Sequence, residues 1–232
     1  MRHPAPRWLK LALLAIVVTL TLWQSWYVGW VLWWKWFDPQ MTSFQSQRLD
    51  ELKEKNPTAV LKKQWLPYAK ISTQLKRAVI AAEDDKFIDH EGFDWEGIQK
   101  ALEKNQKKGK VVAGGSTISQ QLAKNLLLSP NKTVLRKVEE ASITLWLEIL
   151  WDKRRILEVY LNVVEWGSGI FGADAAAQRY FGISATQLNA EQSARLAVML
   201  PAPRRFEKNP NSPYVNGRVE LILGRMNSAE VP

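Results

Sequence analysis

Acidic residues gather around one histidine between positions 83 and 92. The stretch reads Glu83, Asp84, Asp85, Lys86, Phe87, Ile88, Asp89, His90, Glu91 and Gly92. Glu83 ends an apolar helical pattern, where partial burial would raise the proton affinity of its carboxyl group and suit it to be a general base. A solvated helix end would show the same composition. Since His90 is the only histidine outside the N-terminal tail, it cannot belong to a multi-histidine metal site.

A second polar group follows Gly114-Gly115 at the start of an expected helix. Thr117, Gln120, Gln121 and Lys124 fall within an arc of about 100° on one helix face. Ile118, Leu122 and Leu126 occupy the opposite face, which would pack against the core. The free N–H groups at the helix start would add a natural anion site. An ordinary amphipathic helix with a solvated face would show the same pattern.

Basic residues form two further clusters. Arg136 and Lys137 precede Glu139 and Glu140, so Arg136 can form a helical ion pair with either glutamate. Lys153 opens another basic run, and both clusters also fit ordinary solvated helix faces. A carboxylate that accepts a proton, close to groups that hold an anion, is typical of group transfer from a phosphorylated donor.

The spacing of apolar residues predicts that a mainly α-helical domain positions these groups. Helices are expected at 43–54, 72–86, after Asp94, from Ser116 or Thr117 to a break at Ser129-Pro130, at 133–150, 153–164, 173–181, 189–201 and 214–226. The segment 104–115 is expected to be a loop rich in lysine and glycine, and 167–172 a glycine turn between two helices. Because the 133–150 helix is heavily apolar, we expect it at the centre of the core.

The N-terminal region contains a long apolar segment. No charged residue occurs from Leu11 to Trp34, and at about 1.5 Å per residue this segment can cross a hydrocarbon core of about 30 Å. A cleaved signal peptide is the alternative, but its apolar part is normally about 7–15 residues long. Basic residues before the segment favour a cytoplasmic N-terminus. The expected organisation is a cytoplasmic tail (1–10), a transmembrane helix (11–34), a juxtamembrane connection (35–70) and an external domain (71–232).

Composition narrows the classes of function. The chain has no cysteine, which excludes disulfides and thiol catalysis, and its net charge is +9. A mild basic excess suits anionic lipid headgroups or a phosphate-bearing substrate. A domain tethered outside the membrane would not meet nucleic acid. Tryptophans on one side of the membrane helix would face lipid or a partner helix; they are Trp23, Trp26, Trp30 and Trp33.

Taken together, these motifs resemble those of the family-51 glycosyltransferases, the transglycosylases that polymerise peptidoglycan. The resemblance covers roughly residues 60–205. The first motif is matched at Glu83, Asp84, Phe87, His90 and Gly92; the second from Gly114 to Asn125, including Ser116, Thr117, Gln120, Gln121, Lys124 and Asn125; the third at Arg136, Lys137 and Glu139; and the fourth from Lys153 to Asn162.

The resemblance implies a lysozyme-like helical fold and a monofunctional enzyme that acts on lipid II and the growing lipid-linked glycan. Glu83 would be the catalytic base and Glu139 the second acidic residue of the donor site. The other motif residues, with Lys153, would line the substrate site, and their cations would hold the pyrophosphate. Glu139 could hold a divalent cation, magnesium or manganese, or only position these cations.

The resemblance also implies a place in the cell and leaves alternatives. The expected location is the bacterial inner membrane, with the catalytic domain in the periplasm and other cell-wall proteins as partners of the membrane helix. The alternatives are a lytic transglycosylase or muramidase on a related fold, and a non-catalytic membrane scaffold for cell-wall enzymes.

Overall fold

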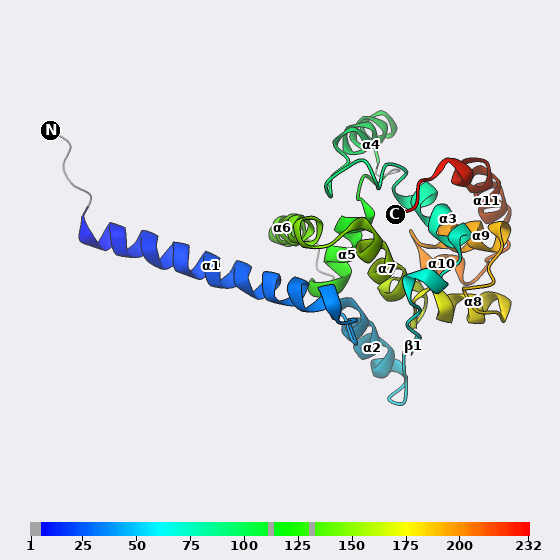
Figure 1. Ribbon diagram of the computed structural model, residues 1–232, viewed down its shortest axis with the longest axis horizontal. Helices are drawn as coiled ribbons and strands as arrows, with labels where there is room; N and C mark the ends of the chain where they lie inside the picture. The colour runs from blue at the N-terminus through cyan, green and yellow to red at the C-terminus, as the bar shows by residue number, and fades with distance from the viewer. Residues whose placement is uncertain (1–5, 111–113, 130–132) are drawn as a thin grey trace.

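The computed structural model describes residues 6–110, 114–129 and 133–232, and shows a helical body from which one long helix projects (Figure 1). That helix, α1 (Arg7–Trp36), is the only helix in the described ranges that is long and apolar enough to cross a membrane. It extends beyond the predicted apolar segment at both ends. The first half of the predicted tail, residues 111–113 of the predicted loop and Pro130 of the predicted break lie outside the described residues.

The body is mainly α-helical, as the sequence predicts. Its helices are α2 (Ser43–Lys55), η1 (Tyr68–Lys70), α3 (Thr73–Glu83), α4 (Trp95–Lys108), α5 (Ile118–Leu127), α6 (Val134–Leu150), α7 (Lys153–Val163), α8 (Ala173–Phe181), α9 (Ala190–Met199), α10 (Pro203–Phe206), α11 (Pro213–Arg225) and η2 (Met226–Ser228). Three short strands, β1 (Lys62–Lys63), β2 (Glu165–Gly167) and β3 (Ile170–Phe171), form a sheet of order β1-β3-β2. Strand β3 pairs in parallel with β1 and antiparallel with β2.

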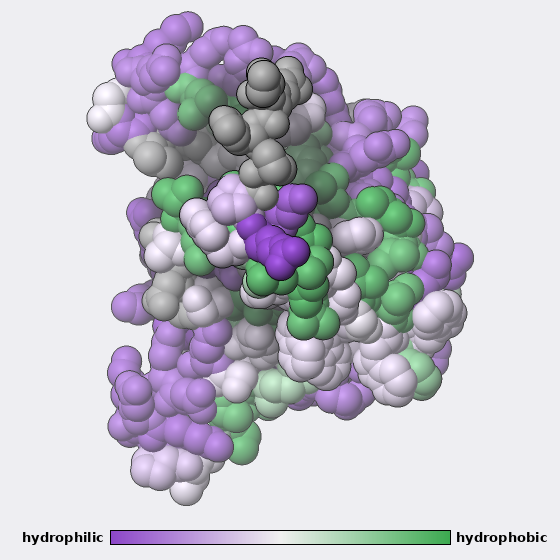
Figure 2. Space-filling view, turned by 90° about the vertical axis from the view of Figure 1, so that its left-hand side faces the viewer, coloured by the Kyte–Doolittle hydropathy of each residue, from purple (hydrophilic) through white to green (hydrophobic). Residues whose placement is uncertain are grey.

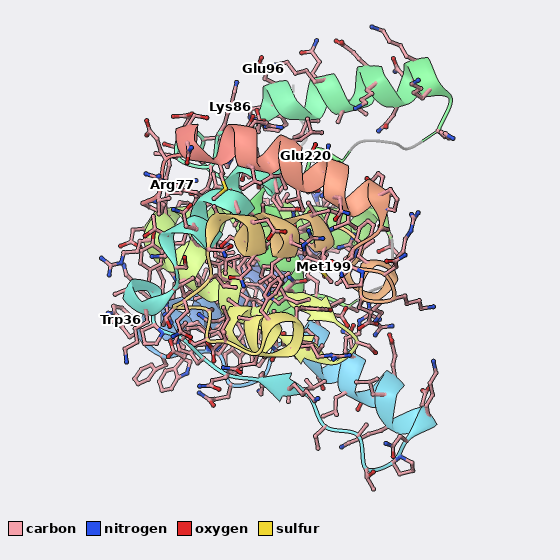
Figure 3. All side chains as sticks on the ribbon, turned by 90° about the vertical axis from the view of Figure 1, so that its right-hand side faces the viewer. Trp36, Arg77, Lys86, Glu96, Met199 and Glu220 are labelled. Atoms are coloured by element: carbon pink, nitrogen blue, oxygen red, sulfur yellow. The ribbon has the colours of Figure 1, made fainter. Side chains whose placement is uncertain are left out.

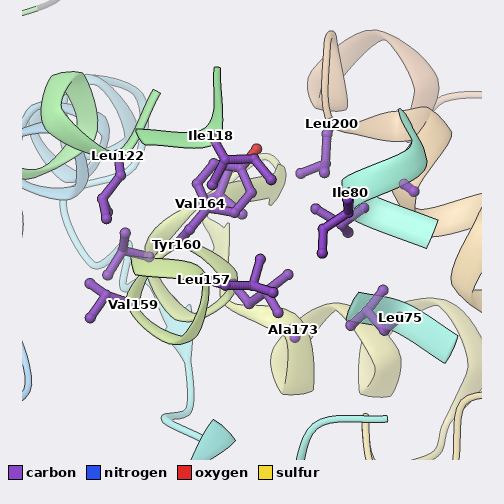
Figure 4. Close-up of a cluster of buried hydrophobic side chains, with 14 of the residues drawn as sticks. Leu75, Ile80, Ile118, Leu122, Leu157, Val159, Tyr160, Val164, Ala173 and Leu200 are labelled. Carbon is purple, nitrogen blue, oxygen red and sulfur yellow. The ribbon is translucent and has the colours of Figure 1, made fainter. Parts of the chain in front are cut away.

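Helix α7 lies at the centre of the core. Its Leu157 and Tyr160 are fully buried, between Ile80 of α3 and Ile118 of α5 (Figure 4). Nearly every residue of α7 after its first turn is buried, polar Asn162 included. This helix therefore fills the position that the sequence analysis expected for residues 133–150.

The expectation that 133–150 forms the core centre is wrong. In α6, Ile143 and Leu147 are the buried apolar residues, and they pack toward α5. Other apolar side chains of α6 are exposed, and they are Val134, Leu135, Val138, Leu145 and Ile149. The helix lies against α1 at the edge of the body, so its apolar composition reflects contact with α1 and an exposed apolar face.

Helix ends follow the predicted caps. Asp94, Asp152 and Asn189 each accept a hydrogen bond from the backbone two or three residues into their helices. Two boundaries differ from expectation: α3 ends at Glu83, and α4 continues to Lys108 through most of the lysines that were assigned to a loop. Helix α4 lies apart from the central helices, and a Lys86–Glu96 ion pair links its first turn to the stretch after α3 (Figure 3).

The glycine turn predicted at 167–172 lies between α7 and α8, and it overlaps the β2–β3 hairpin, which begins at Glu165. Gly172 adopts a φ of +85°, and a Cβ atom there would lie 2.8 Å from the backbone oxygen of Asn162. Only glycine fits that approach, which brings the start of α8 against the end of α7.

The C-terminal half of α1 is part of the body. Tyr27, Val31 and Trp34 are buried, and Gln24 Oε1 accepts hydrogen bonds from the side chains of Ser142 (2.6 Å) and Trp146 (2.9 Å). The segment expected to be a connection is also packed, because α2 lies on α5 and β1 joins the sheet. A cleaved signal peptide would abandon all the contacts of α1, so they favour an uncleaved anchor.

Candidate active site

Glu83, the last residue of α3, is held by a short chain of hydrogen bonds. Gln121 Nε2 of α5 donates to Glu83 Oε2 at 2.7 Å, and the buried Tyr160 hydroxyl donates to Gln121 Oε1 at 3.0 Å. Because Tyr160 occupies the amide oxygen, the amide nitrogen of Gln121 must face Glu83. Burial raises the pKa of Glu83, against the opposing effects of the Gln121 hydrogen bond and the Lys124 charge. A carboxylate in this environment is suited to accept a proton.

The neighbouring Asp84 fills the N-terminus of α5. Only 2% of its side-chain surface is exposed, and its Oδ2 accepts a hydrogen bond from the Ile118 backbone N–H at 2.9 Å. His90 accepts a hydrogen bond from the Gly92 N–H on Nδ1, so its proton lies on Nε2, which donates to Asp84 Oδ1 at 2.9 Å. The anion site expected at this helix start is therefore taken by the protein's own carboxylate.

The polar face predicted on α5 divides into two parts. Thr117 and Gln120 form a reciprocal capping box, and the Thr117 hydroxyl donates to the Gly92 backbone oxygen at 2.7 Å. Both side chains are buried by these contacts, whereas Ser116 is exposed before the helix. Gln121 and Lys124 point elsewhere, into a cavity.

That cavity, here called the active-site cavity, has a volume of about 460 Å³. It is lined by Phe44, Arg48, Gln121, Lys124, Asn125, Ser129, Arg136, Val164, Glu165, Leu200, Pro201 and Pro203. Burial lowers the pKa of Lys124, and the negative charges of Glu140 and Glu83 act in the opposite direction. Lys124 thus lies within electrostatic reach of both glutamates. Arg136 also lines the cavity, and its buried Nε atom has no hydrogen-bond partner among the described residues.

Glu140 and Glu139 point to different parts of the molecule. Glu140 is buried and accepts a hydrogen bond from Arg136 Nη1 (3.0 Å), and it also pairs with Lys137. Glu139 instead accepts a hydrogen bond from the Tyr27 hydroxyl of α1 at 3.3 Å. The structure therefore groups the cations with Glu140, which the sequence analysis did not select. The spacing could have indicated this pairing, because Glu140 lies one helical turn after Arg136 on the same face of the helix.

The residues present do not fit the divalent cation considered for Glu139. In residues 6–110, 114–129 and 133–232, no group of three or more His, Cys, Asp or Glu side chains is placed to hold a metal ion. Glu139 faces a tyrosine, and Glu140 is already paired with two cations.

Comparison with known proteins decides the family. A sequence model of the family described as "Transglycosylase" matches residues 49–227, which is more than half of the chain. The chain belongs to the transglycosylase family. It is 61% identical to the biosynthetic peptidoglycan transglycosylase of Dechloromonas aromatica, over 97% of this chain and 98% of the relative. The proteins of the same name from Azoarcus sp. and Laribacter hongkongensis are 60% and 50% identical, each over 97% of this chain and over 97% and 99% of the relative.

Some motif residues of this transglycosylase support the site from outside the cavity. Phe87 is fully buried, and Lys153 Nζ lies 4.8 Å from the centre of its ring. Lys153 also donates to the His90 backbone oxygen (2.5 Å) and to Glu148 (2.8 Å). These contacts fix the stretch after Glu83. Unlike Lys124 and Arg136, Lys153 is not among the residues that line the cavity.

The active-site cavity of this transglycosylase is also lined by Arg48 and Glu165, two charged residues of an ion-pair cluster that the sequence did not reveal. Arg48 of α2 contacts Glu165 (3.2 Å) and Glu51 (2.7 Å), and Arg204 of α10 contacts the same two carboxylates. Burial raises the pKa of Glu165 against the pull of both arginines. Arg48 precedes the region that resembles the family, and Glu165 follows an apolar helix. The sequence around these two residues therefore did not indicate that they line the same cavity.

Proposed function

We propose that this chain polymerises lipid II into glycan strands while anchored in the inner membrane of a bacterium. It is a peptidoglycan transglycosylase of cell-wall biosynthesis, with a lysozyme-like helical domain and a helix suited to anchor it in a membrane. The observation that carries the proposal is the active-site cavity, which is lined by Gln121, the partner of Glu83, and by the cations Lys124 and Arg136.

Glu83 is assigned as the general base. The acceptor is the C4 hydroxyl of N-acetylglucosamine, a weak nucleophile that must lose its proton as the new bond forms. Its oxygen attacks the anomeric carbon of the donor sugar, the bond from that carbon to the diphosphate oxygen breaks, and the proton passes to Glu83. A raised pKa makes this carboxylate a stronger base, and the Gln121 hydrogen bond keeps one oxygen in place.

The cations are assigned to the leaving group. A diphosphate leaves with negative charge, so it needs electrostatic stabilisation more than a general acid. Lys124 and Arg136 line the cavity, and Lys137 lies close to Lys124. Glu140 forms ion pairs with Arg136 and Lys137 and so orients both cations of α6. We assign Glu140, rather than Glu139, as the second acidic residue. An α-linked donor and a β-linked product make this a single inverting displacement.

Orientation follows from charge and from the position of the domain. Arg7 and Lys10 lie near the start of α1, and the body lies at its other end. The excess of positive charge before the apolar segment supports a cytoplasmic N-terminus. The catalytic domain then lies in the periplasm.

The test is a polymerisation assay with purified full-length protein and lipid II, beside a separate incubation with finished cell-wall sacculi. We expect glycan strands from lipid II, and a loss of rate in Glu83→Gln of roughly 10²–10⁴-fold. Glu54→Gln, at an exposed position on α2, is the matched control and should retain the wild-type rate. Cleavage of sacculi without polymerisation would identify a lytic enzyme. The absence of both reactions would support the scaffold alternative.

A further inference from the structure

A second cavity lies where α1 meets the body, and it is called the tryptophan-lined cavity here. It has a volume of about 500 Å³. Its lining residues are Trp26, Trp30, Trp33, Trp34, Asp38, Gln40, Met41, Ser43, Leu126 and Leu127. The walls are mostly aromatic and aliphatic, with polar groups confined to the segment after α1. Such a surface binds hydrocarbon in preference to a charged headgroup.

The tryptophan-lined cavity and the active-site cavity share the wall formed by α2 and α5. Ser43 lines the first and Phe44 the second, and on α5 Lys124 lines the active-site cavity while Leu127 lines the other. Lys124 and Leu127 are separated by about one helical turn, or roughly 5 Å along the axis. A molecule whose diphosphate lies at Lys124 therefore has the aromatic cavity within a short reach of its apolar end.

The length of the free part of α1 indicates that the same cavity lies near the membrane surface. The part of α1 free of the body runs from Arg7 to Leu22, which is roughly 24 Å at about 1.5 Å per residue. A hydrocarbon core is about 30 Å thick. The bilayer must therefore reach the tryptophans that follow, among them Trp30 and Trp33, which remain partly exposed. Indole rings are typical of this interface.

We propose that the tryptophan-lined cavity binds the first part of the polyprenyl chain of the lipid-linked donor and of the polyprenyl diphosphate that it releases. This inference rests on the proposed function, because it requires a donor whose diphosphate carries a long hydrocarbon chain. The chain passes from the diphosphate at Lys124 and Arg136 over Leu127 into the aromatic cavity, and from there into the bilayer.

The kinetic test compares lipid II with a long polyprenyl chain and an analogue with a short chain, in detergent. Trp30→Ala and Leu127→Ser each remove part of the cavity wall, and Trp36→Ala is the matched control because Trp36 lines a different pocket with Trp151. We expect the two cavity variants to raise KM for the long-chain donor roughly 10-fold. Their kcat/KM with the short-chain analogue should equal that of the wild type, and Trp36→Ala should behave as wild type with both donors.

A second measurement locates the chain directly and does not depend on turnover. A long-chain polyprenyl diphosphate with a photoreactive group near the diphosphate is cross-linked to the full-length protein, and the labelled residues are identified by mass spectrometry. We expect labels within 26–43 and at Leu126 or Leu127, with competition by unlabelled polyprenyl diphosphate. Labels on the outer face of α6, or labels displaced only by phospholipid or detergent, would overturn the assignment.

The two proposals fail in different ways. If the wild type does not polymerise either donor, the proposed function is overturned, and the inference falls with it. If the wild type polymerises lipid II and both cavity variants keep its dependence on chain length, only the assignment of the cavity is overturned. Unfolding temperatures of the variants close to that of the wild type establish that the changes in KM arise in the folded protein.

Discussion

Glu83 has a carboxyl group whose ionised form is disfavoured by burial. Burial raises its pKa, and the Gln121 hydrogen bond and the positive charges of Lys124 and Arg218 offset part of that effect. The unfolded chain has no such penalty. The pKa of Glu83 is therefore higher in the folded state, and its ionisation costs stability as the pH rises from the unfolded pKa through the folded one. Function at this residue comes at the expense of stability.

The first prediction concerns the stability of Glu83→Gln. A neutral amide has no ionisation cost, so the variant should unfold a few degrees above the wild type at neutral pH. The gain should shrink on acidification and disappear below the ordinary pKa of a glutamate, where both forms are neutral. Calorimetry or circular dichroism between acidic and neutral pH measures it. An unfolding temperature below that of the wild type at neutral pH would show that the ionised carboxylate stabilises the fold.

The second prediction concerns the pH dependence of the rate. The Gln121 hydrogen bond lowers the pKa of Glu83, so its removal in Gln121→Met should raise that pKa further. The acid limb of the profile of kcat/KM against pH should move to higher pH. Tyr160→Phe is the control because it removes only the group that orients Gln121, and its shift should be smaller. An acid limb that stays in place in Gln121→Met would mean that another group is the base.

At the scale of the elements, the arrangement of the helices depends on which helix lies at the centre of the core. The caps at Asp94, Asp152 and Asn189 are local, so spacing alone located the helix starts. The choice between α6 and α7 is not local, because both carry many apolar residues. The apolar residues of α6 are divided between α5, α1 and the exposed face, and a count of apolar residues cannot tell these surroundings apart.

The same reasoning explains what was predictable at the site. Glu83, Gln121, Lys124 and Arg136 were recognised by their types and spacing. The sequence did not predict that Asp84 and Thr117 bind the backbone at the start of α5. A polar side chain next to a helix start has the same sequence pattern whether it binds substrate or backbone. The choice of Glu140 over Glu139 depended on the direction in which α6 faces.

The third prediction tests the seam between α1 and α6. Gln24→Leu leaves the Ser142 hydroxyl and the Trp146 indole N–H without their acceptor, which should lower the free energy of unfolding by about 1–3 kcal/mol in detergent. Since α6 also carries Arg136 and Glu140, KM for lipid II should rise. Ser25→Leu, at an exposed position on the same helix, is the matched control. Equal stability of the two variants would show that the seam does not hold α6.

At the scale of the whole molecule, the C-terminal half of α1 packs into the body, so the anchor helix and the body form one unit. The face from which α1 projects shows apolar residues between hydrophilic upper and lower edges (Figure 2). On α6, the apolar side chains of Leu145 and Ile149 are 49% and 69% exposed. Because the free part of α1 is shorter than a hydrocarbon core, we expect this side of the body to approach the lipid.

The fourth prediction measures that depth. The chain has no cysteine, so a single one can be introduced and labelled with an environment-sensitive fluorophore. Labels at Leu145→Cys and Ile149→Cys should show blue-shifted emission in liposomes, as in an apolar medium. A label at Lys208→Cys, an exposed position near α10, should report water. Emission typical of water at all three positions would show that the body stands clear of the bilayer.

Two separate roles meet at the active-site cavity: a base at Glu83, which is held by the lining residue Gln121, and an anion site at Lys124 and Arg136. The most direct test measures lipid II binding and the single-turnover rate of bond formation for Glu83→Gln and Lys124→Met. We predict that Glu83→Gln binds lipid II as the wild type does and loses roughly 10²–10⁴-fold in rate, whereas Lys124→Met loses affinity for lipid II. Bond formation at the wild-type rate in Glu83→Gln would contradict the account.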